Sequence, residues 1–319
     1  MITVIFASRN GEETLPRMLE ALCALEAPRG GWNILAVDNG STDRTPDILT
    51  GYQSRLPLHR VFHPEPGKNA ALNKALEQIE GELVVFTDDD VVPEKDWLRT
   101  FEKVAEARPD YDIFGGAITP DWPTSPPAWL LEDVPLGPAY GVTPPDRDEG
   151  PLRPSAVFGG NMMIRAEVFR NGIRFDDGIG PGVGAYYTMG GETDLTERLV
   201  RLGHRCWFSP DATVRHVIRP YQMKRRWVLR RAIRSGKGGG AQDLRLGRVS
   251  AATPKWLGAP RFLYRELLLT MIGPIELKRF WRSLVHDSSR IKVIQMDKQW
   301  NFFYLLGRIH FHRQRGAGS

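Results

Sequence analysis

The stretch LVVFTDDDVVPEKDW, residues 83–97, sets an apolar run directly before three consecutive aspartates, Asp88, Asp89 and Asp90. The run predicts a buried strand, and we expect a helix that opens at Pro93. Three adjacent carboxylates repel one another, so the stretch requires a compensating cation. Carboxylate oxygens suit Mg²⁺ or Mn²⁺, which keep several waters and bridge to substrate phosphates. The alternative interpretation is a solvated acidic turn leading into the helix.

The first 118 residues alternate between strand-like runs and segments with the spacing of a helix face. Strands are expected at ITVIFAS (2–8), NILAVDNG (33–40) and LHRVFHP (58–64), in addition to the run before the aspartates. Strands that are apolar on both faces and separated by helices indicate a mostly parallel, doubly wound sheet flanked by helices. We therefore predict an α/β fold.

Unusual polar residues follow three of these strands. They are Ser8 and Arg9 after the first, Asp38 and Asn39 after the second, and Asp88 to Asp90 after the fourth. Any one of them alone is typical of a turn or a helix cap. Open parallel sheets bind ligands beyond the carboxyl ends of their strands, so the coincidence at three strand ends predicts a binding site.

Two common nucleotide-binding motifs are absent from the sequence. The segment after the first strand reads FASRNGEE, without the GxGxxG of a dinucleotide site. The segment HPEPGKNA has a Gly-Lys pair but lacks the upstream glycine and the following Ser or Thr of a phosphate loop. The sequence therefore argues against a dehydrogenase and against a P-loop nucleoside triphosphatase (NTPase).

From about residue 2 to 218, the chain resembles the family 2 glycosyltransferases, enzymes of the Rossmann-like GT-A fold that use nucleotide sugars. The resemblance rests on segments in the family's order: VIFASRNGEETLPRMLEAL (4–22), AVDNGSTDRT (36–45), PGKNAALNKAL (66–76), VVFTDDDVVPEKDWL (84–98), FGGNMMIRAEVF (158–169), GGETDLTERLVRLG (190–203) and DATVRH (211–216). The resemblance is strongest with bacterial members that build surface polysaccharides or exopolysaccharides.

The resemblance implies how the donor is bound. Asp38 would read the base, and the same pocket would be lined by Ser8, Arg9 and either Glu12 or Glu13. The segment FASRN replaces the family's usual PTYN, so Arg9 stands where a tyrosine often stacks on the base. The nucleotide and diphosphate would be supported by Lys68, Asn73, Asp88 and Asp89, with Asp88 near the ribose.

The aspartate run resembles the family's DXD motif, which implies a Mn²⁺ or Mg²⁺ cofactor. Asp90 would be the direct metal ligand, and His216 matches a histidine that completes the metal site in some members. A lone histidine is more often structural. Gly160 and Asn161 are similar to residues beside the donor sugar and acceptor.

The catalytic base has two candidates. The family's common motif GEDxDL appears here one residue shorter, as GGETDL, so the base is either Glu192 or Asp194. Glu192 follows the glycines directly and is the stronger candidate to face the crevice. Asp194 also fits a structural role as a first-turn carboxylate, which the helix dipole favours.

We predict two regions in the chain. Residues 1–218 would form the nucleotide-sugar-binding and catalytic domain, and residues 219–319 a basic, amphipathic, helical C-terminal extension. Within the first region, ten of the 36 residues from 119 to 154 are proline, which predicts a loop or lid. This lid and the glycine-rich GPGVG, residues 180–184, would close over the donor.

The C-terminal region carries much of the positive charge of a chain whose formal net charge is +5. Residues 224–237 hold seven Lys or Arg and no acid. Helices of this kind suit an anionic membrane interface, although helices packed on the catalytic domain or an oligomer contact are alternatives. The sequence has no spanning apolar run or secretory signal, so we expect a cytoplasmic enzyme, peripheral on the inner face of the cell membrane.

The expected reaction is metal-dependent, inverting transfer of a sugar from a nucleotide diphosphosugar, with a UDP-sugar as the default donor. The acceptor would be a hydroxyl of a glycan or of a lipid-linked molecule. A nucleotidyltransferase that makes the activated sugar is one alternative, but its Gly-rich basic loop is missing after the first strand. A non-enzymatic nucleic-acid-binding module is the other, and the acidic cluster opposes it because it repels phosphate backbones.

Overall fold

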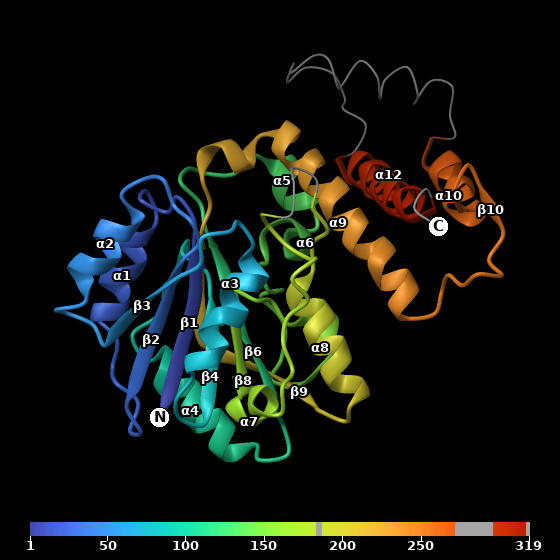
Figure 1. Ribbon diagram of the computed structural model, residues 1–319. Coiled ribbons are helices and arrows are strands. Elements are labelled where there is room, and N and C mark those ends of the chain that lie inside the picture. The colour runs from blue at the N-terminus through green and yellow to red at the C-terminus, as the bar shows by residue number, and fades with distance from the viewer. Residues whose placement is uncertain (183–186, 272–295, 317–319) are drawn as a thin grey trace. The chain divides into compact units, whose positions relative to one another are not determined.

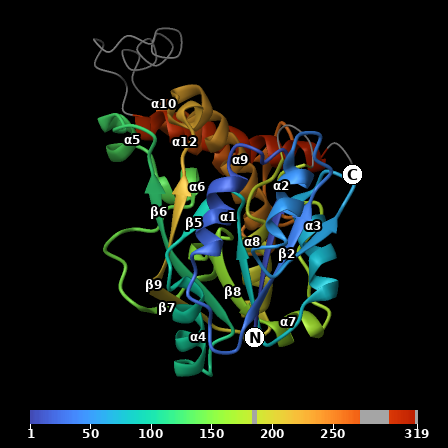
Figure 2. The same cartoon turned by 90° about the vertical axis from the view of Figure 1, so that its left-hand side faces the viewer.

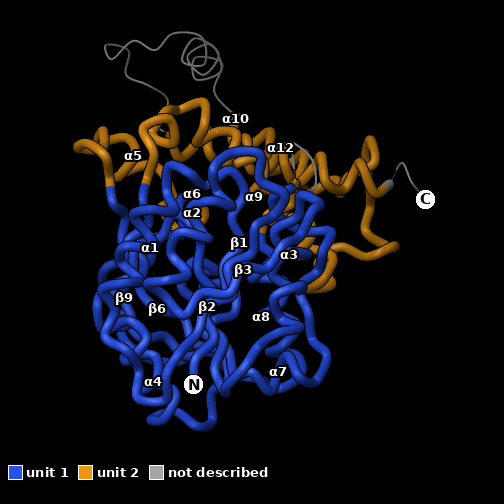
Figure 3. The backbone as a smooth tube through the Cα atoms, turned by 60° about the vertical axis from the view of Figure 1, so that its left-hand side comes forward, with its two compact units in different colours: residues 1–121, 140–185, 190–217 blue, residues 122–139, 186–189, 218–319 orange. Residues whose placement is uncertain are grey.

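The computed structural model describes residues 1–182, 187–271 and 296–316. These residues form two compact units (Figure 3). The first comprises residues 1–121, 140–185 and 190–217, and the second comprises residues 122–139, 186–189 and 218–319, apart from the residues not described. Of the glycine-rich segment expected to close over the donor, residues 183 and 184 lie outside the described part.

The first unit is built on a sheet whose first four strands are parallel and adjacent. They are β1 (Ile2–Ser8), β2 (Trp32–Asp38), β3 (Leu58–Phe62) and β4 (Leu83–Thr87). The register pairs Ser8 with Asp38, so both lie at the same edge of the sheet. Since β1 also pairs in parallel with β4, the aspartates that follow β4 lie at that edge too.

Beyond β4 the sheet is mixed. The strand order is β3-β2-β1-β4-β8-β6-β9-β5, with β7 paired to β9. β8 (Asn161–Arg165) is antiparallel to both β4 and β6 (Ile113–Asp121), and β6 is parallel to β9 (Cys206–Val217). β7 (Gly150–Leu152) runs antiparallel to β9. The α/β class predicted from the sequence is confirmed, with an antiparallel strand inserted in the middle of the sheet.

Helices cover both faces of this sheet (Figures 1 and 2). α1 (Leu15–Cys23), α2 (Thr45–Tyr52) and α4 (Trp97–Ala107) contribute to one apolar core cluster. α3 (Lys68–Ala75), α7 (Ala166–Arg170) and α8 (Gly191–Arg201) contribute to the other. Side chains alternate along a strand, so Val4 and Phe6 pack in the first cluster and Ile5 in the second. This is why β1 is apolar throughout.

The short elements of the first unit are η1 (Leu76–Gln78), η2 (Pro154–Ala156) and α6 (Leu136–Tyr140), the last of which crosses the boundary between the units. In the proline-rich segment 119–154, α5 (Ala128–Glu132), α6 and β7 are each five residues or shorter. The proline content thus limits regular structure as expected.

The helix predicted to open at Pro93 is absent there. Residues Val91–Pro93 form a short strand, β5, and α4 begins at Trp97. Val91 and Val92 are β-branched and find a ladder partner in β9, which the local sequence does not reveal. Proline is tolerated because β5 is at the end of the strand order.

The second unit is mainly helical. It contains α5, η3 (Pro220–Met223), α9 (Arg225–Arg245), the hairpin of β10 (Lys255–Trp256) and β11 (Ala259–Pro260), α10 (Arg261–Met271) and α12 (Met296–Gly316). In the described part of the chain, no helix has the length and apolar content needed to span a membrane. Both cysteines, Cys23 and Cys206, are free.

Glycines allow α9 and α12 to approach closely. A Cβ placed on Gly236 would lie 1.9 Å from the carbonyl oxygen of Tyr304, and one on Gly307 would lie 2.1 Å from that of Ile233. Asp243, which is 1 % exposed, accepts three hydrogen bonds from the guanidinium of Arg308 across the same contact. The glycines and this ion pair therefore hold the backbones of the two helices close together.

Candidate active site

Each of the three aspartates after β4 contacts a different partner. The pairs are Asp88 with Lys68 of α3, Asp89 with the hydroxyl of Ser8 of β1, and Asp90 with His216 of β9. The mutual repulsion of the carboxylates is thus relieved in three directions, by an ammonium, a hydroxyl and an imidazole. The topology makes this possible, because β1 and β9 end, and α3 begins, at the same edge of the sheet.

Lys68 is held where α3 begins. Its backbone N–H donates to the carbonyl oxygen of Pro181 at 3.0 Å. Burial lowers the pKa of its ammonium, but Asp88, Glu192 and Asp90 raise it, and the net pKa is well above the ordinary value. Lys68 therefore stays charged, and Glu192 lies within electrostatic range of it.

His216 is oriented by two contacts. Its Nδ1 lies 2.6 Å from the carbonyl oxygen of Tyr140, and its Nε2 lies 3.6 Å from Asp90 Oδ2. Since a carbonyl only accepts hydrogen bonds, Nδ1 carries the proton and Nε2 faces the carboxylate. Burial lowers the imidazole pKa, but Asp90 and the Tyr140 carbonyl raise it, and the net pKa of His216 lies above its ordinary value.

The Asp90–His216 pair fits a divalent cation. Its facing atoms are a hard carboxylate oxygen and an imidazole nitrogen whose tautomer is fixed by a backbone carbonyl, as is usual for metal-binding histidines. Among the described residues, no group of three or more His, Cys, Asp or Glu is arranged to hold a metal by itself. Two protein ligands suit Mg²⁺ or Mn²⁺, because these ions complete their coordination with water and substrate phosphates.

Glu192 lies in the first turn of α8 and faces the acidic cluster across two glycines. A Cβ on Gly159 would lie 3.4 Å from the Cβ of Glu192, and one on Gly160 would lie 3.5 Å from Asp88 Oδ2. Gly159 thus adjoins Glu192, and its neighbour Gly160 adjoins Asp88. Gly160 is held in place by the hydroxyl of Thr87, which donates to its carbonyl oxygen at 3.0 Å.

Asp194 points elsewhere. It is 4 % exposed and accepts a hydrogen bond of 2.9 Å from Arg198 Nε, one helical turn later. Arg198 in turn donates to the carbonyl oxygen of Arg174 at 2.7 Å. The carboxylate of Asp194 thus positions an arginine that holds a neighbouring segment, a structural contact in addition to the first-turn position considered from the sequence.

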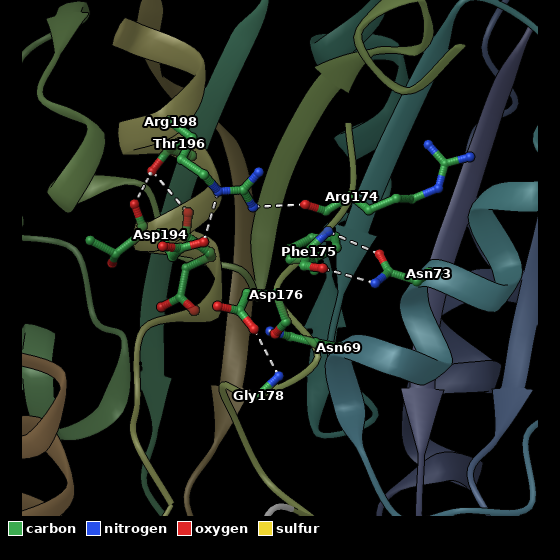
Figure 4. A network of polar contacts seen from close by, with 11 residues as sticks. Asn69, Asn73, Arg174, Phe175, Asp176, Gly178, Asp194, Thr196 and Arg198 are labelled. Atoms are coloured by element: carbon green, nitrogen blue, oxygen red, sulfur yellow. Dashed lines mark hydrogen bonds and ion pairs between the residues drawn. The ribbon is translucent and has the colours of Figure 1, made fainter. Parts of the chain in front are cut away.

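Segment 174–178 is clamped between α3 and α8 (Figure 4). From α3, Asn69 donates to the carbonyl oxygen of Asp176 at 2.8 Å, and Asn73 bonds both the N–H and the carbonyl oxygen of Phe175 at 2.9 Å. Asn73 also donates to the carboxylate of Asp177 at 2.6 Å. The amide expected to support the nucleotide and diphosphate is thus bonded to this segment.

Asn161 is also enclosed by protein. It is fully buried, accepts from the indole N–H of Trp97 at 2.8 Å, and donates to the carbonyl oxygens of Ala117 and Ala212 at 2.8 and 2.7 Å. Its amide joins three elements and does not line the site, although the residue follows Gly160 directly.

Replacing Asn161 with alanine is expected to lower the free energy of unfolding by about 2–4 kcal/mol, because one indole N–H and two carbonyl oxygens lose their partner. Urea unfolding monitored by tryptophan fluorescence would measure the loss. Asn33→Ala is the matched control, since the amide of Asn33 makes one long contact, 3.2 Å to Glu80. Equal losses in both variants would contradict the role assigned to Asn161.

The residues expected to bind the nucleotide lie in two loops that are bonded to each other. Glu12 accepts from the backbone N–H of Arg44 at 3.2 Å and donates its own N–H to Asp43. Asp38 is buried and accepts from the backbone N–H of Ser41 at 3.0 Å. Arg9, by contrast, is exposed, as is Glu13. The loops that follow β1 and β2 thus form one wall at the carboxyl edge of the sheet.

Two positions in the site were not predicted. Asn69 is buried beside Gly191, where a Cβ would come within 2.5 Å of its amide nitrogen. Tyr140 contributes its carbonyl oxygen to His216 from within the proline-rich segment. An asparagine directly after the Gly-Lys pair was the available signal for the first, whereas a backbone contact from a distant loop leaves no signal in the sequence.

Together, the mixed sheet and the acidic cluster at its carboxyl edge define a nucleotide-dependent transferase of the GT-A type. The family model described as glycosyl transferase family 2 matches residues 3–172, more than half of the chain. The chain belongs to glycosyltransferase family 2. It is therefore a glycosyltransferase, which decides against the nucleotidyltransferase and against a non-enzymatic module.

Relatives in sequence carry glycosyltransferase names. Glycosyltransferase AglE of Haloferax volcanii is 24% identical over 239 residues, which cover 74% of this chain and 72% of AglE. Beta-monoglucosyldiacylglycerol synthase of Nostoc sp. is 32% identical over 101 residues, covering 30% of this chain and 22% of the synthase. The chain thus spans most of the first relative but under a quarter of the second.

Solved structures share the fold. The mannosyltransferase PcManGT from Pyrobaculum calidifontis, in complex with GDP-Man and Mn²⁺, superposes with a TM-score of 0.60 at 18% identity, over 96% of this chain and 86% of that one. S. aureus TarS in complex with UDP-GlcNAc gives 0.55 at 15% identity, over 98% and 92%. The GT-A fold is therefore confirmed.

Proposed function

We propose that this enzyme transfers a sugar, with inversion, from a nucleotide diphosphosugar to a hydroxyl of a glycan or a lipid-linked acceptor. The observation that carries the proposal is the placement of Lys68, Asp88, Asp90 and Glu192 around a glycine pair at the carboxyl edge of the sheet. A charged lysine, a cation-binding pair and a separate carboxylate are the groups this reaction requires. The catalytic region we propose is residues 1–218, as the sequence predicted.

The donor would occupy the edge of the sheet beyond β1, β2 and β4. Asp38 would accept a hydrogen bond from the base, and Arg9, which is exposed at the end of β1, would contact the nucleotide from solvent. Lys68 would lie against the diphosphate, where its positive charge offsets the negative charge that develops on the leaving group. A UDP-sugar is the proposed donor, supported by the fold shared with a UDP-GlcNAc complex.

Asp90 and His216 would hold Mn²⁺ or Mg²⁺. When bound, such an ion supplies positive charge that stabilises the leaving diphosphate. A fold neighbour that binds Mn²⁺ with a sugar nucleotide supports this cofactor. Glu192 would accept the proton of the acceptor hydroxyl as it attacks the anomeric carbon. The bond between Asp194 and Arg198 supports the choice of Glu192 over Asp194 for this role.

The acceptor and the location are proposed from charge and from relatives. One relative is named for a glycolipid product, beta-monoglucosyldiacylglycerol synthase, which supports an acceptor at a membrane. The basic C-terminal region would bring the enzyme to the anionic inner face of the cell membrane from the cytoplasm. Surface polysaccharide synthesis is the process that fits this setting, and TarS, a poly(ribitol-phosphate) beta-N-acetylglucosaminyltransferase, supports it.

Donor binding is expected to raise the melting temperature. At a concentration of UDP near 100 times its Kd, with Mn²⁺ present, the native state gains about 2.7 kcal/mol, which shifts Tm by roughly 4 °C for a chain of this size. Differential scanning fluorimetry with UDP, GDP and dTDP, each with and without Mn²⁺, measures the shift and identifies the nucleotide. No shift with any of the three would contradict the proposed donor class.

A further inference from the structure

The hairpin of β10 and β11 exposes two large apolar side chains at its turn. Trp256 is 56% exposed and Leu257 is 62% exposed. The turn residues Leu257 and Gly258 have φ of 45° and 79°, the left-handed region in which Gly, Asn or Asp is usual. A leucine there is strained and buries little, so the fold of the hairpin does not explain this residue.

The helix that follows the hairpin extends the same apolar surface. The ring of Trp256 packs edge-on against Tyr264 of α10, with 5.0 Å between ring centroids. Leu268 follows Tyr264 by four residues and so lies on the same helix face, where it is 61% exposed. Another face of α10 is buried, because Leu263 packs against α12. Figure 1 shows the hairpin and α10 next to each other at one end of the second unit.

Positive charge surrounds these side chains. Residues 244–271 contain five Lys or Arg and one acid, Glu266. Lys255, Arg261 and Arg265 are exposed, and Glu266 lies 3.5 Å from Arg308. From α12, the side chain of Arg313 approaches Gly258, at 3.5 Å from the position of a Cβ. An apolar tip ringed by cations is complementary to a surface that is anionic outside and apolar within.

Part of the region expected to contact lipid is buried. Val228, Leu229 and Ala232 of α9, within the basic stretch 224–237, are buried, as are Trp300 and Leu305 of α12. Residues 272–295 lie outside the described part. Among the described residues of the C-terminal region, the large apolar side chains that are more than half exposed are Trp256 and Leu257 of the hairpin and Leu268 and Leu269 of α10.

We propose that the hairpin tip, Trp256 and Leu257, inserts into the interface of an anionic bilayer, with Lys255, Arg261, Arg265 and Arg313 contacting lipid headgroups. The inference rests on the membrane partner proposed above and narrows it to one turn. Burial of one leucine side chain on insertion corresponds to a gain of about tenfold or more in partitioning. The strain at Leu257 is then explained by function at the membrane.

Leu257→Asn tests the tip without harming the fold, because asparagine suits the left-handed turn better than leucine. Full-length protein is sedimented with vesicles of phosphatidylcholine alone or mixed with phosphatidylglycerol, at low and high salt. Wild type is expected to bind the mixed vesicles at low salt, and Leu257→Asn about tenfold more weakly. Leu202→Asn, at a leucine 66% exposed in the first unit, is the matched control and should bind as wild type.

The outcomes separate the two levels of the proposal. If the wild-type protein does not bind anionic vesicles at low salt, both the proposed membrane partner and the proposed role of the tip are wrong. Equal binding by wild type and Leu257→Asn overturns the tip and leaves the membrane partner standing. Sedimentation velocity without lipid adds a third case: a dimer that Leu257→Asn abolishes, with no vesicle binding, would assign the tip to self-association.

Discussion

Replacing Glu192 with glutamine is expected to lower kcat for sugar transfer by about 10²- to 10⁴-fold, the usual contribution of a general base. The amide is nearly isosteric with the carboxylate but cannot accept the proton of the acceptor hydroxyl. Because Glu192 is proposed to act on the acceptor, KM for the donor should change little. Initial rates of nucleoside diphosphate release, with and without acceptor, measure both constants.

Asp194→Asn is the matched acid-to-amide control two residues along the same helix. The buried carboxylate of Asp194 accepts from Arg198, so its neutralisation weakens a charge-assisted bond and the clamp on Arg174. We expect a loss of stability of about 1–3 kcal/mol, with a smaller effect on kcat than Glu192→Gln. If instead Asp194→Asn abolished transfer and Glu192→Gln did not, the base would be Asp194.

The structure gives a physical reason for choosing between two acids that the sequence left open. Both lie in the first turn of α8, where the helix dipole favours a carboxylate. The difference arises from neighbours distant in the chain: Gly159 packs against Glu192, and the carbonyl oxygen of Arg174 fixes the arginine that holds Asp194. Motif spacing alone could not show which acid would face the crevice.

The gathering of polar residues at one sheet edge could be predicted, because it follows from parallel strands with apolar faces. Ser8 and Asp38 are direct register partners, as that argument requires. The contact between Asp90 and His216 has another origin. It arises because β5 pairs Val91 with His216, and β5 falls where the sequence predicted a helix from Pro93. A three-residue strand is determined by its partner and carries too little local pattern to be recognised.

Two amides predicted to face the donor, Asn73 and Asn161, bind backbone groups instead. Each satisfies carbonyl oxygens that would otherwise be buried without a hydrogen bond. A polar residue inside a motif is a candidate ligand contact, but an asparagine that is buried for structural reasons gives the same sequence pattern. Only the three-dimensional path of residues 117, 175 and 212 shows where these amides are needed.

In the second unit, composition predicted a basic helical region but not which apolar side chains would remain exposed. The run SGKGGG, residues 235–240, is a poor helix former because glycine lowers helix propensity. In the structure these glycines permit the close contact of α9 with α12, and apolar residues of both helices are buried. Exposed apolar side chains are found instead in the hairpin, a segment without helical periodicity.

Asp90→Ala is expected to remove metal-dependent turnover, with a loss of about 10³-fold, since stabilisation of the leaving group by a cation is worth several kcal/mol and each 1.36 kcal/mol is a factor of ten in rate. His216→Ala should weaken the metal less, because one carboxylate ligand and the substrate phosphates remain. Turnover measured across a Mn²⁺ titration after EDTA treatment separates a loss of metal affinity from a loss of rate.

The control for Asp90→Ala is Glu94→Gln, which neutralises an exposed acid four residues later that pairs with Arg215. It adjoins the same strand pair but does not face the site, so the Mn²⁺ response should match wild type. Thermal shift gives a second readout: Mn²⁺ should increase the stabilisation by UDP in wild type and in Glu94→Gln, but not in Asp90→Ala. Normal turnover by Asp90→Ala, with Mn²⁺ or with EDTA, would show that catalysis proceeds without a metal at this position and that Lys68 alone neutralises the diphosphate.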